Sequence, residues 1–253
     1  MSDEQHWRLL ETELDRWQSS GRTARFWLRD DDAVAPTEAL EKLIGLTGDA
    51  AVPLTLAVIP ELTGAPLAEH LAASGHVTVA VHGWSHQNHA GPSDKKQELG
   101  SHRAQSLVLD ELTCGFDKLS GLYGPQFTAM LVPPWNRIDA SLLPHLAALG
   151  FTSVSVFDKE KPAPISMINT HVDLMDWHGS RGGRERGQLI AEIVARLQVM
   201  FDHGGHMGFL THHLVHDEAA WQFIDSLMTR SSAHPACRWV APSELLDPDA
   251  SQA

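Results

Sequence analysis

The sequence predicts an α/β fold built on a parallel sheet. Apolar runs that are typical of strands alternate with amphipathic helical segments about eight times, at a spacing of roughly 30 residues. Polar residues with reactive side chains follow five of the strands, and the carboxyl ends of parallel strands gather at one face of such folds. No linker or break in composition divides the chain, so we expect one domain over residues 1–253.

Composition excludes several classes of function. The formal net charge is −13 and there is no basic run, which argues against a nucleic-acid-binding surface. The acidic start of the chain, residues 1–5, does not resemble a signal peptide, and no apolar run is long enough to span a bilayer. We therefore expect a cytoplasmic protein without a membrane partner. Histidine is unusually frequent: the chain has 16, and eight of them lie within 82–89 and 203–216.

The expected elements follow from periodicity and from proline and glycine stops. The first helix, residues 6–18, carries Trp7, Leu10, Leu14 and Trp17 on one side and should pack on the body of the protein. Further helices are expected over 37–46, 66–73, 98–122 and 140–149, in a segment ending near 202, and over 219–228. Strands are expected over 25–28, 53–60, 79–81, 127–132 and 151–157, within 165–174, and over 207–210 and 237–240.

A pair of histidines follows the strand at 79–81. His82 and His86 are four residues apart, and in an extended chain side chains at this spacing point to one face. The valines, Gly83 and the turn-forming residues after His86 favour a strand end over a helix. Two histidines need a third ligand, commonly a carboxylate, before they can hold a catalytic metal with a place for water.

Three consecutive aspartates follow the strand at 25–28. Asp30, Asp31 and Asp32 repel one another in a partly buried place unless a cation neutralises them. The alternative is a solvated acidic turn that caps the next helix. Because the histidine pair lacks a carboxylate, we interpret the aspartates as its source.

Three more strand ends carry polar or aromatic side chains. They are Pro133-Pro134-Trp135-Asn136-Arg137, Asp173 with Asp176-Trp177-His178, and Thr211-His212-His213.

Together, these five strand ends resemble the polysaccharide deacetylases, carbohydrate esterase family four, across Arg29 to His213. The first motif of that family, Thr-Phe-Asp-Asp-Gly, is similar to residues 29–33, and the second, His-(Ser/Thr)-x-x-His, matches His82 and His86 with Gly83 in the hydroxyl position. The third, Arg-x-Pro plus an aromatic residue, is similar to residues 132–135 but lacks the arginine. The fourth, Asp-x-x-Asp-Trp, matches residues 173–177 in full, and the fifth, Leu-x-x-His, fits Leu210 and His213.

The resemblance implies a distorted (β/α)7-8 barrel with parallel strands. It also implies that Asp31 is the catalytic base and Asp32 a metal ligand with His82 and His86; a shift to Asp30 and Asp31 is the alternative register. His213 would be the catalytic acid, with His212 as its competitor.

Further roles complete this hypothesis. Asp176 would hold His213 charged through the Trp177 region, and the Trp135 backbone N–H would bind the oxyanion. Arg29 or Arg137 would replace the missing arginine. Supporting positions are assigned to Asp30, Pro134, Trp177 and His178, and the apolar walls of the site to Trp84, Trp135 and Trp177.

The expected activity is metal-dependent hydrolysis of a C–N amide bond. A divalent ion would activate water and polarise the carbonyl, Asp31 would accept the water proton, and His213 would protonate the leaving nitrogen. One ion is expected, zinc first, with cobalt, nickel, manganese or iron as alternatives. The predicted substrate is an N-acetylated sugar or oligosaccharide. A cyclic imide or ureide, or carbohydrate binding without catalysis, are the alternatives, and the sequence leaves the oligomeric state open.

Overall fold

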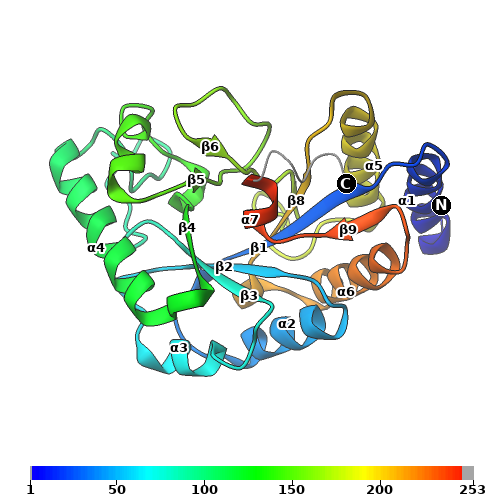
Figure 1. Cartoon of the computed structure of the whole chain (residues 1–253), viewed down its shortest axis with the longest axis horizontal. Coiled ribbons are helices and arrows are strands. Elements are labelled where there is room, and N and C mark those ends of the chain that lie inside the picture. The colour runs from blue at the N-terminus through cyan, green and yellow to red at the C-terminus, as the bar shows by residue number, and fades with distance from the viewer. Residues whose placement is uncertain (1, 247–253) are drawn as a thin grey trace. The chain divides into compact units, whose positions relative to one another are not determined.

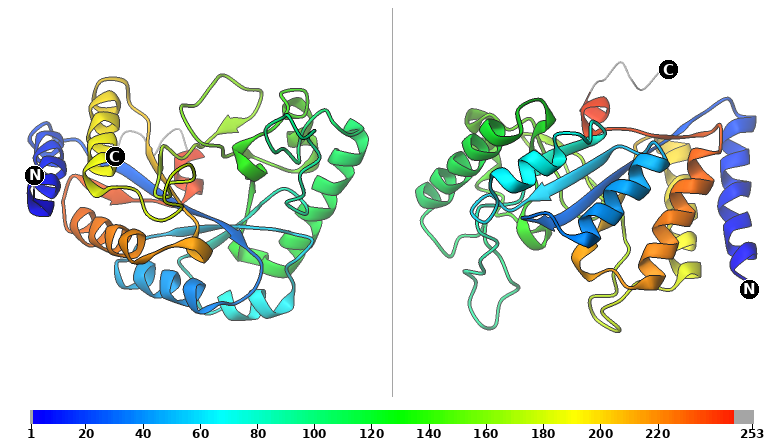
Figure 2. Two further views of the ribbon diagram at one scale, coloured as in Figure 1. Left: turned by 180° about the vertical axis from the view of Figure 1, so that it is seen from behind. Right: turned by 90° about the horizontal axis from the view of Figure 1, so that it is seen from below.

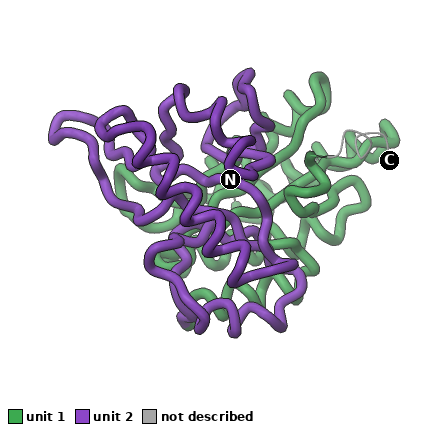
Figure 3. The backbone as a smooth tube through the Cα atoms, turned by 60° about the vertical axis from the view of Figure 1, so that its left-hand side comes forward, with its two compact units in different colours: residues 1–30, 38–54, 170–253 green, residues 31–37, 55–169 purple. Residues whose placement is uncertain are grey.

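The computed structural model describes residues 2–246 and divides into two compact units, coloured separately in Figure 3. Of the described residues, unit 1 holds 2–30, 38–54 and 170–246, and unit 2 holds 31–37 and 55–169. Strand β1 (Ala24–Ala33) contributes residues 24–30 to unit 1 and residues 31–33 to unit 2. The aspartate triplet therefore lies where the chain passes from one unit to the other.

Unit 1 combines short strands with long helices, labelled in Figure 1. Besides its part of β1 it contains α1 (Asp3–Ser19), α2 (Glu38–Asp49), β7 (Val172–Asp173), α5 (Arg186–His203), β8 (Met207–Thr211), η4 (His213–Val215), α6 (Glu218–Ser232), β9 (Cys237–Trp239) and α7 (Pro242–Leu246). Strands β8 and β9 pair in parallel with β1, and β7 pairs in parallel with β8.

Aromatic side chains fill the core of unit 1 beneath these strands. The rings of Phe26, Phe209 and Trp239 lie 5.3–5.4 Å apart in all three pairings. Helix α1, which covers the helix expected over 6–18, packs along α5, as both views in Figure 2 show. Its inward side is the apolar one, and Trp7 stacks on Phe223 of α6 at 5.4 Å.

Unit 2 contains five strands in sequence order, beside the end of β1. Its elements are β2 (Leu54–Val58, apart from its first residue), α3 (Ala65–Leu71), β3 (Val77–Val81), α4 (Gln105–Tyr123), η1 (Gly124–Gln126), β4 (Phe127–Leu131), η2 (Pro134–Asn136), η3 (Leu143–Leu149), β5 (Ser153–Val154) and β6 (Ser166–Met167). The order is β2-β3-β4-β5-β6, and the Ile59 N–H donates to the Ala33 carbonyl at the end of β1. Helix α4 packs along β3 and β4.

The predicted fold class is confirmed: the chain is an α/β protein with parallel strands of the distorted (β/α) barrel type. Strands β2 and β3 are buried along almost their whole length, as expected of strands covered on both faces. Among residues 2–246, no helix is both long enough and apolar enough to cross a membrane.

Several predicted boundaries are wrong. The strand expected over 25–28 continues to Ala33, because pairing with β8 runs to Asp30 and the aspartates continue the strand. The helix expected over 98–122 begins at Gln105, since residues 98–104 form an irregular segment. The helix expected from 140 is a 3₁₀ segment, Leu143–Leu149, and the strand expected over 151–157 is reduced to β5.

Candidate functional site

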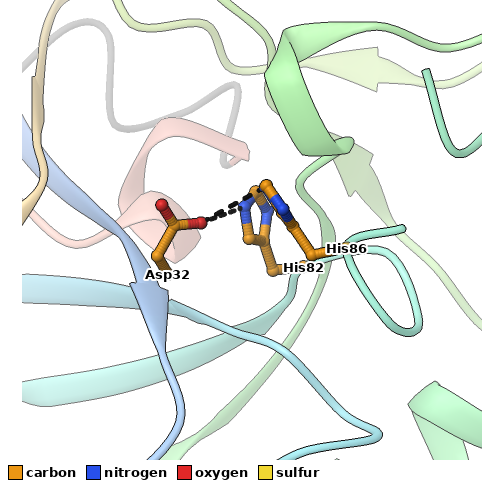
Figure 4. Close-up of side chains that lie close together, drawn as sticks. All are labelled: Asp32, His82 and His86. Carbon is orange, nitrogen blue, oxygen red and sulfur yellow. Dashed lines mark hydrogen bonds and ion pairs between the residues drawn. The ribbon is translucent and has the colours of Figure 1, made fainter. Parts of the chain in front are cut away.

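The predicted metal ligands Asp32, His82 and His86 lie together in unit 2. Asp32 stands near the end of β1, His82 follows β3 directly, and His86 lies in the turn after it. One carboxylate oxygen, Asp32 Oδ1, is 3.1 Å from His82 Nε2 and 3.3 Å from His86 Nε2. Figure 4 shows both imidazoles turned toward that oxygen.

The neighbours of His82 fix which of its nitrogens can bind a cation. Its Nδ1 lies 2.9 Å from the Val132 carbonyl, which can only accept, so Nδ1 carries the proton and donates it. In the neutral ring, Nε2 then presents a lone pair to the carboxylate oxygen of Asp32. Two electron-rich atoms facing each other at 3.1 Å require a cation or a proton between them. A backbone carbonyl that orients a histidine in this way is common around protein metal sites.

The residues present therefore fit a divalent ion. Two imidazole nitrogens and one carboxylate oxygen form a donor set typical of catalytic zinc, and it leaves coordination positions open. His82 is almost fully buried, and burial lowers its pKa; the negative charges of Asp31 and Asp32 outweigh this effect and raise the pKa above its usual value. Burial and repulsion from His82 lower the pKa of His86.

Strained backbone surrounds these ligands. Asp32 has φ 74°, Gly83 φ 60° and His86 φ 57°, all in the left-handed region. Trp135 and Asn136 also have positive φ, at 54° and 56°. Non-glycine residues seldom adopt this conformation, and it costs of order 1–3 kcal/mol where the surroundings enforce it. Such clustering is typical of functional sites.

Residues 133–137 form one side of the site, and Pro134 is buried. The Trp135 ring lies 4.4 Å from the His86 ring, centroid to centroid, which places this tryptophan beside a candidate ligand. Binding of an oxyanion by its backbone N–H stays a prediction. Trp84 is half-buried, and its backbone bonds to Glu61 and Glu98 define its place in the turn after β3.

A cavity of about 610 Å³ lies next to this side within unit 2. Its lining includes the two residues that follow Trp135 and three groups of basic character. The full lining is Asp94, Lys95, Gln97, His102, Asn136, Arg137, Ile138, Val156 and Met167. Arg137 also donates from Nη1 to the Lys96 carbonyl at 2.8 Å.

A second cluster, in unit 1, joins Asp30 to His213. Both side chains are buried, and His213 Nδ1 pairs with Asp30 Oδ1. Asp30 Oδ2 accepts from the His213 backbone N–H at 2.9 Å and from Thr211 Oγ1 at 2.7 Å. Burial works to raise the pKa of Asp30, but attraction and hydrogen bonding from His213 and the bond from Thr211 outweigh it and lower the pKa.

Asp30, to which the sequence gave a supporting position or, in the alternative register, the role of base, is therefore the carboxylate that holds His213. The expected partner, Asp176, instead accepts from the backbone N–H groups of Gly179 and Ser180, each at 2.9 Å. These bonds, the one from Ser180 first, lower its pKa. Asp176 thus organises its own turn, and its effect on His213 has no support from a direct bond among the described contacts.

The remaining predicted residues of unit 1 are divided between buried and exposed positions. His212 packs edge-on against Trp177 at 4.7 Å, and the Trp177 indole N–H donates to Asp173. Trp177 is 42% exposed, consistent with a wall but not with a core position. His178 is exposed, and Arg29 is fully buried in β1.

The sequence did not predict the roles of two residues that contact these clusters, Glu98 and Thr211. Glu98 was assigned to a helix, and no motif or periodicity marks it as a partner of the turn after β3. Thr211 precedes the histidine pair in a buried strand, and its alternation with His213 could have suggested a shared face.

Comparisons with known proteins bear on the fold. No family profile matches the chain, and no curated protein matches it by sequence. Solved structures do match. A candidate polysaccharide deacetylase from Mycobacterium smegmatis has a TM-score of 0.68 at 17% identity, over 89% of this chain and 90% of its own. A family 4 carbohydrate esterase from Streptomyces lividans, in complex with acetate, has a TM-score of 0.58 at 16% identity, over 88% and 95%.

A third match is a mutant of a pseudoenzyme of the same esterase family, with restored enzymatic activity. It has a TM-score of 0.59 at 14% identity, over 89% of this chain and 68% of its own. At these identities the comparisons establish a common fold.

Proposed function

We propose that this protein is a divergent member of the polysaccharide deacetylase family and a metal-dependent hydrolase of C–N amide bonds. The observation that carries the proposal is the convergence of Asp32 Oδ1, His82 Nε2 and His86 Nε2, with the Nδ1 proton of His82 engaged by the Val132 carbonyl. The fold that the chain shares with a polysaccharide deacetylase and a family 4 carbohydrate esterase supports the proposal.

Asp32, His82 and His86 would hold a divalent ion, zinc as the first candidate, which would supply Lewis acidity and lower the pKa of water. Asp31, which is buried and directly precedes Asp32, accepts the proton of the attacking water. His213 donates a proton to the departing nitrogen. The buried Asp30 carboxylate supports this role because it stabilises the protonated imidazole. The backbone N–H of Trp135 donates to the developing oxyanion.

The proposed substrate is an N-acetylated sugar or a short oligosaccharide, handled in the cytoplasm. The half-buried Trp84 and Trp135 and the exposed Trp177 supply apolar surface of the kind that sugar rings contact. The cavity beyond Trp135 has the volume of a small-molecule site. Cyclic imides and ureides present the same carbonyl chemistry and are the second substrate class to test.

One departure favours a different function. Val132 stands where the family's third motif carries an arginine, and its carbonyl is engaged with His82. A protein that lost this arginine could bind carbohydrate without hydrolysing it, as a pseudoenzyme on the same fold.

The deciding experiment measures metal content by mass spectrometry and then amine release from a panel of N-acetyl sugars and cyclic amides. Wild type is compared with Asp31→Asn, and Asp110→Asn on the exposed side of α4 is the matched control. We expect bound metal and turnover of at least one acetylated sugar by the wild type. Asp31→Asn should lose this turnover, and Asp110→Asn should keep it. Bound metal without turnover on any compound would favour the binding protein, and absence of metal would refute the proposal.

A further inference from the structure

Glu98 lies inside the turn that carries the second histidine. Its side chain is buried, with 1% exposure, and both carboxylate oxygens face the backbone of residues 84–86. Ser85 donates from its N–H at 2.7 Å and from its hydroxyl at 3.0 Å, both to Oε1. The N–H of Trp84 lies 3.3 Å from Oε1, and the N–H of His86 lies 3.3 Å from Oε2. Three successive backbone N–H groups thus converge on one anion.

Without an anion at its centre, this conformation of the turn would have a higher free energy. His86 has φ 57°, which is unfavourable for a residue with a β-carbon. If the carboxylate were absent, the converging N–H groups would lose a buried acceptor, at a cost of about 1–3 kcal/mol for each donor left unsatisfied. Glu98 therefore stabilises the backbone conformation in which the His86 imidazole faces Asp32.

Gly83 is part of the same arrangement. A β-carbon at this position would lie 2.1 Å from Glu98 Oε2 and 2.7 Å from Pro134 Cγ. The related motif has serine or threonine here, and this chain has no space for either. The space is occupied by the Glu98 carboxylate, which supplies a brace from outside the motif.

Contacts of residues 98 and 99 fix the main chain of Glu98. The Glu98 carbonyl accepts from Arg103 Nη2 at 3.4 Å, and the buried Leu99 forms a bridge with Ile138. The Leu99 carbonyl also accepts from the Asp139 N–H at 2.8 Å. The carboxylate is thus anchored to the segment that follows residues 133–137.

We propose that Glu98 is a positioning residue for the metal centre: it binds no ion itself, and it fixes the turn of residues 83–86 so that His86 Nε2 faces Asp32 Oδ1. This inference rests on the proposed function, because it presumes that Asp32, His82 and His86 hold a metal. Residues that orient metal ligands typically contribute 10- to 100-fold to metal affinity.

The test is zinc affinity, measured by competition with a chromophoric chelator, together with the absorption spectrum of the cobalt-substituted protein. Glu98→Gln replaces one acceptor oxygen with an amide donor that faces backbone donors. We expect its zinc dissociation constant to rise about 10- to 100-fold. The cobalt spectrum should change because the His86 ligand moves. Glu69→Gln, an exposed glutamate on α3 with the same change in charge, should match the wild type.

Ser85→Ala is the second variant, and it decides the question if Glu98→Gln does not fold. It removes only the hydroxyl contact to Glu98 and should weaken zinc binding by about threefold, in a protein that still folds. Wild-type affinity and an unaltered cobalt spectrum in a folded Glu98→Gln, or wild-type affinity in Ser85→Ala when Glu98→Gln is unfolded, would overturn the inference. If the wild-type protein bound no zinc, the proposed function would fail. That outcome is distinct from equally tight zinc binding by the wild type and by Glu98→Gln, which would overturn only the role of Glu98.

Discussion

The pair formed by Asp30 and His213 should be the most sensitive polar contact in unit 1. Asp30 accepts three hydrogen bonds through its two oxygens, and the fully buried carboxylate has no access to water in exchange. Asp30→Asn keeps the shape and one acceptor oxygen but removes the charge. Bonds to a charged group contribute about 1.5–3 kcal/mol and bonds between neutral groups about 0.5–1.5 kcal/mol. Losing the charge from three bonds should therefore lower the free energy of unfolding by about 3 kcal/mol.

The assay is equilibrium unfolding in urea at pH 7, followed by tryptophan fluorescence and circular dichroism. Thr211→Val is the smaller perturbation, because it removes one bond to Asp30 and leaves the ion pair; a loss of about 1–2 kcal/mol is expected. A double-mutant cycle of Asp30→Asn with His213→Gln should give a coupling free energy of about 2 kcal/mol.

Two results would refute this reasoning. One is an Asp30→Asn protein whose free energy of unfolding lies within about 0.5 kcal/mol of wild type, which is the usual range for surface substitutions. The other is strict additivity in the cycle, which would mean that the two side chains do not stabilise each other.

Three further outcomes are expected. Zinc at about a thousand times its dissociation constant should raise the free energy of unfolding by about 4 kcal/mol, and a chelator should reverse this; a urea midpoint that ignores zinc would contradict the metal site. Burial lowers the pKa of His216 to about 4, so the unfolded chain takes up a proton first as pH falls below about 6.5, and stability is lost toward pH 4. Relative to His216→Asn, wild type should lose about 2 kcal/mol between pH 7 and pH 4.5, after allowing for partial exposure; parallel urea midpoints for the two proteins would contradict this. Phe209→Ala, which empties the space between Phe26 and Trp239, should cost about 3–5 kcal/mol by urea unfolding, whereas a loss below 1 kcal/mol would mean that the core collapses to fill it.

The class of fold was predictable because strands that are buried on both faces have continuous apolar sequences. Strands β2 and β3 are continuous apolar runs, and each is followed by a proline or a polar turn that marks its end. Boundaries were less predictable where tertiary contacts decide them. Residues 98–104 have a helical pattern, yet Glu98 lies outside α4. Its carboxylate accepts hydrogen bonds from the turn after β3 instead.

The candidate site was predictable as far as spacing carries information. The grouping of Asp32 with His82 and His86 follows from residue type and strand ends, and the structure brings these three together. The partner of His213 did not follow, since an adjacent motif pointed to Asp176 while the pairing of β1 with β8 places Asp30 beside it. Contacts of that kind depend on register between strands distant in sequence, which no local pattern reports.

The three consecutive aspartates of β1 have three different surroundings: a histidine and a threonine for Asp30, burial for Asp31, and two imidazoles for Asp32. The strand determines these surroundings, because successive side chains point to alternate sides of a strand. Deleting or inserting one residue before Asp30 would place each carboxylate beside different side chains, although the composition would hardly change. A change in the length of this segment should therefore disturb the surroundings of all three carboxylates at once, whereas a substitution changes only the carboxylate that it replaces.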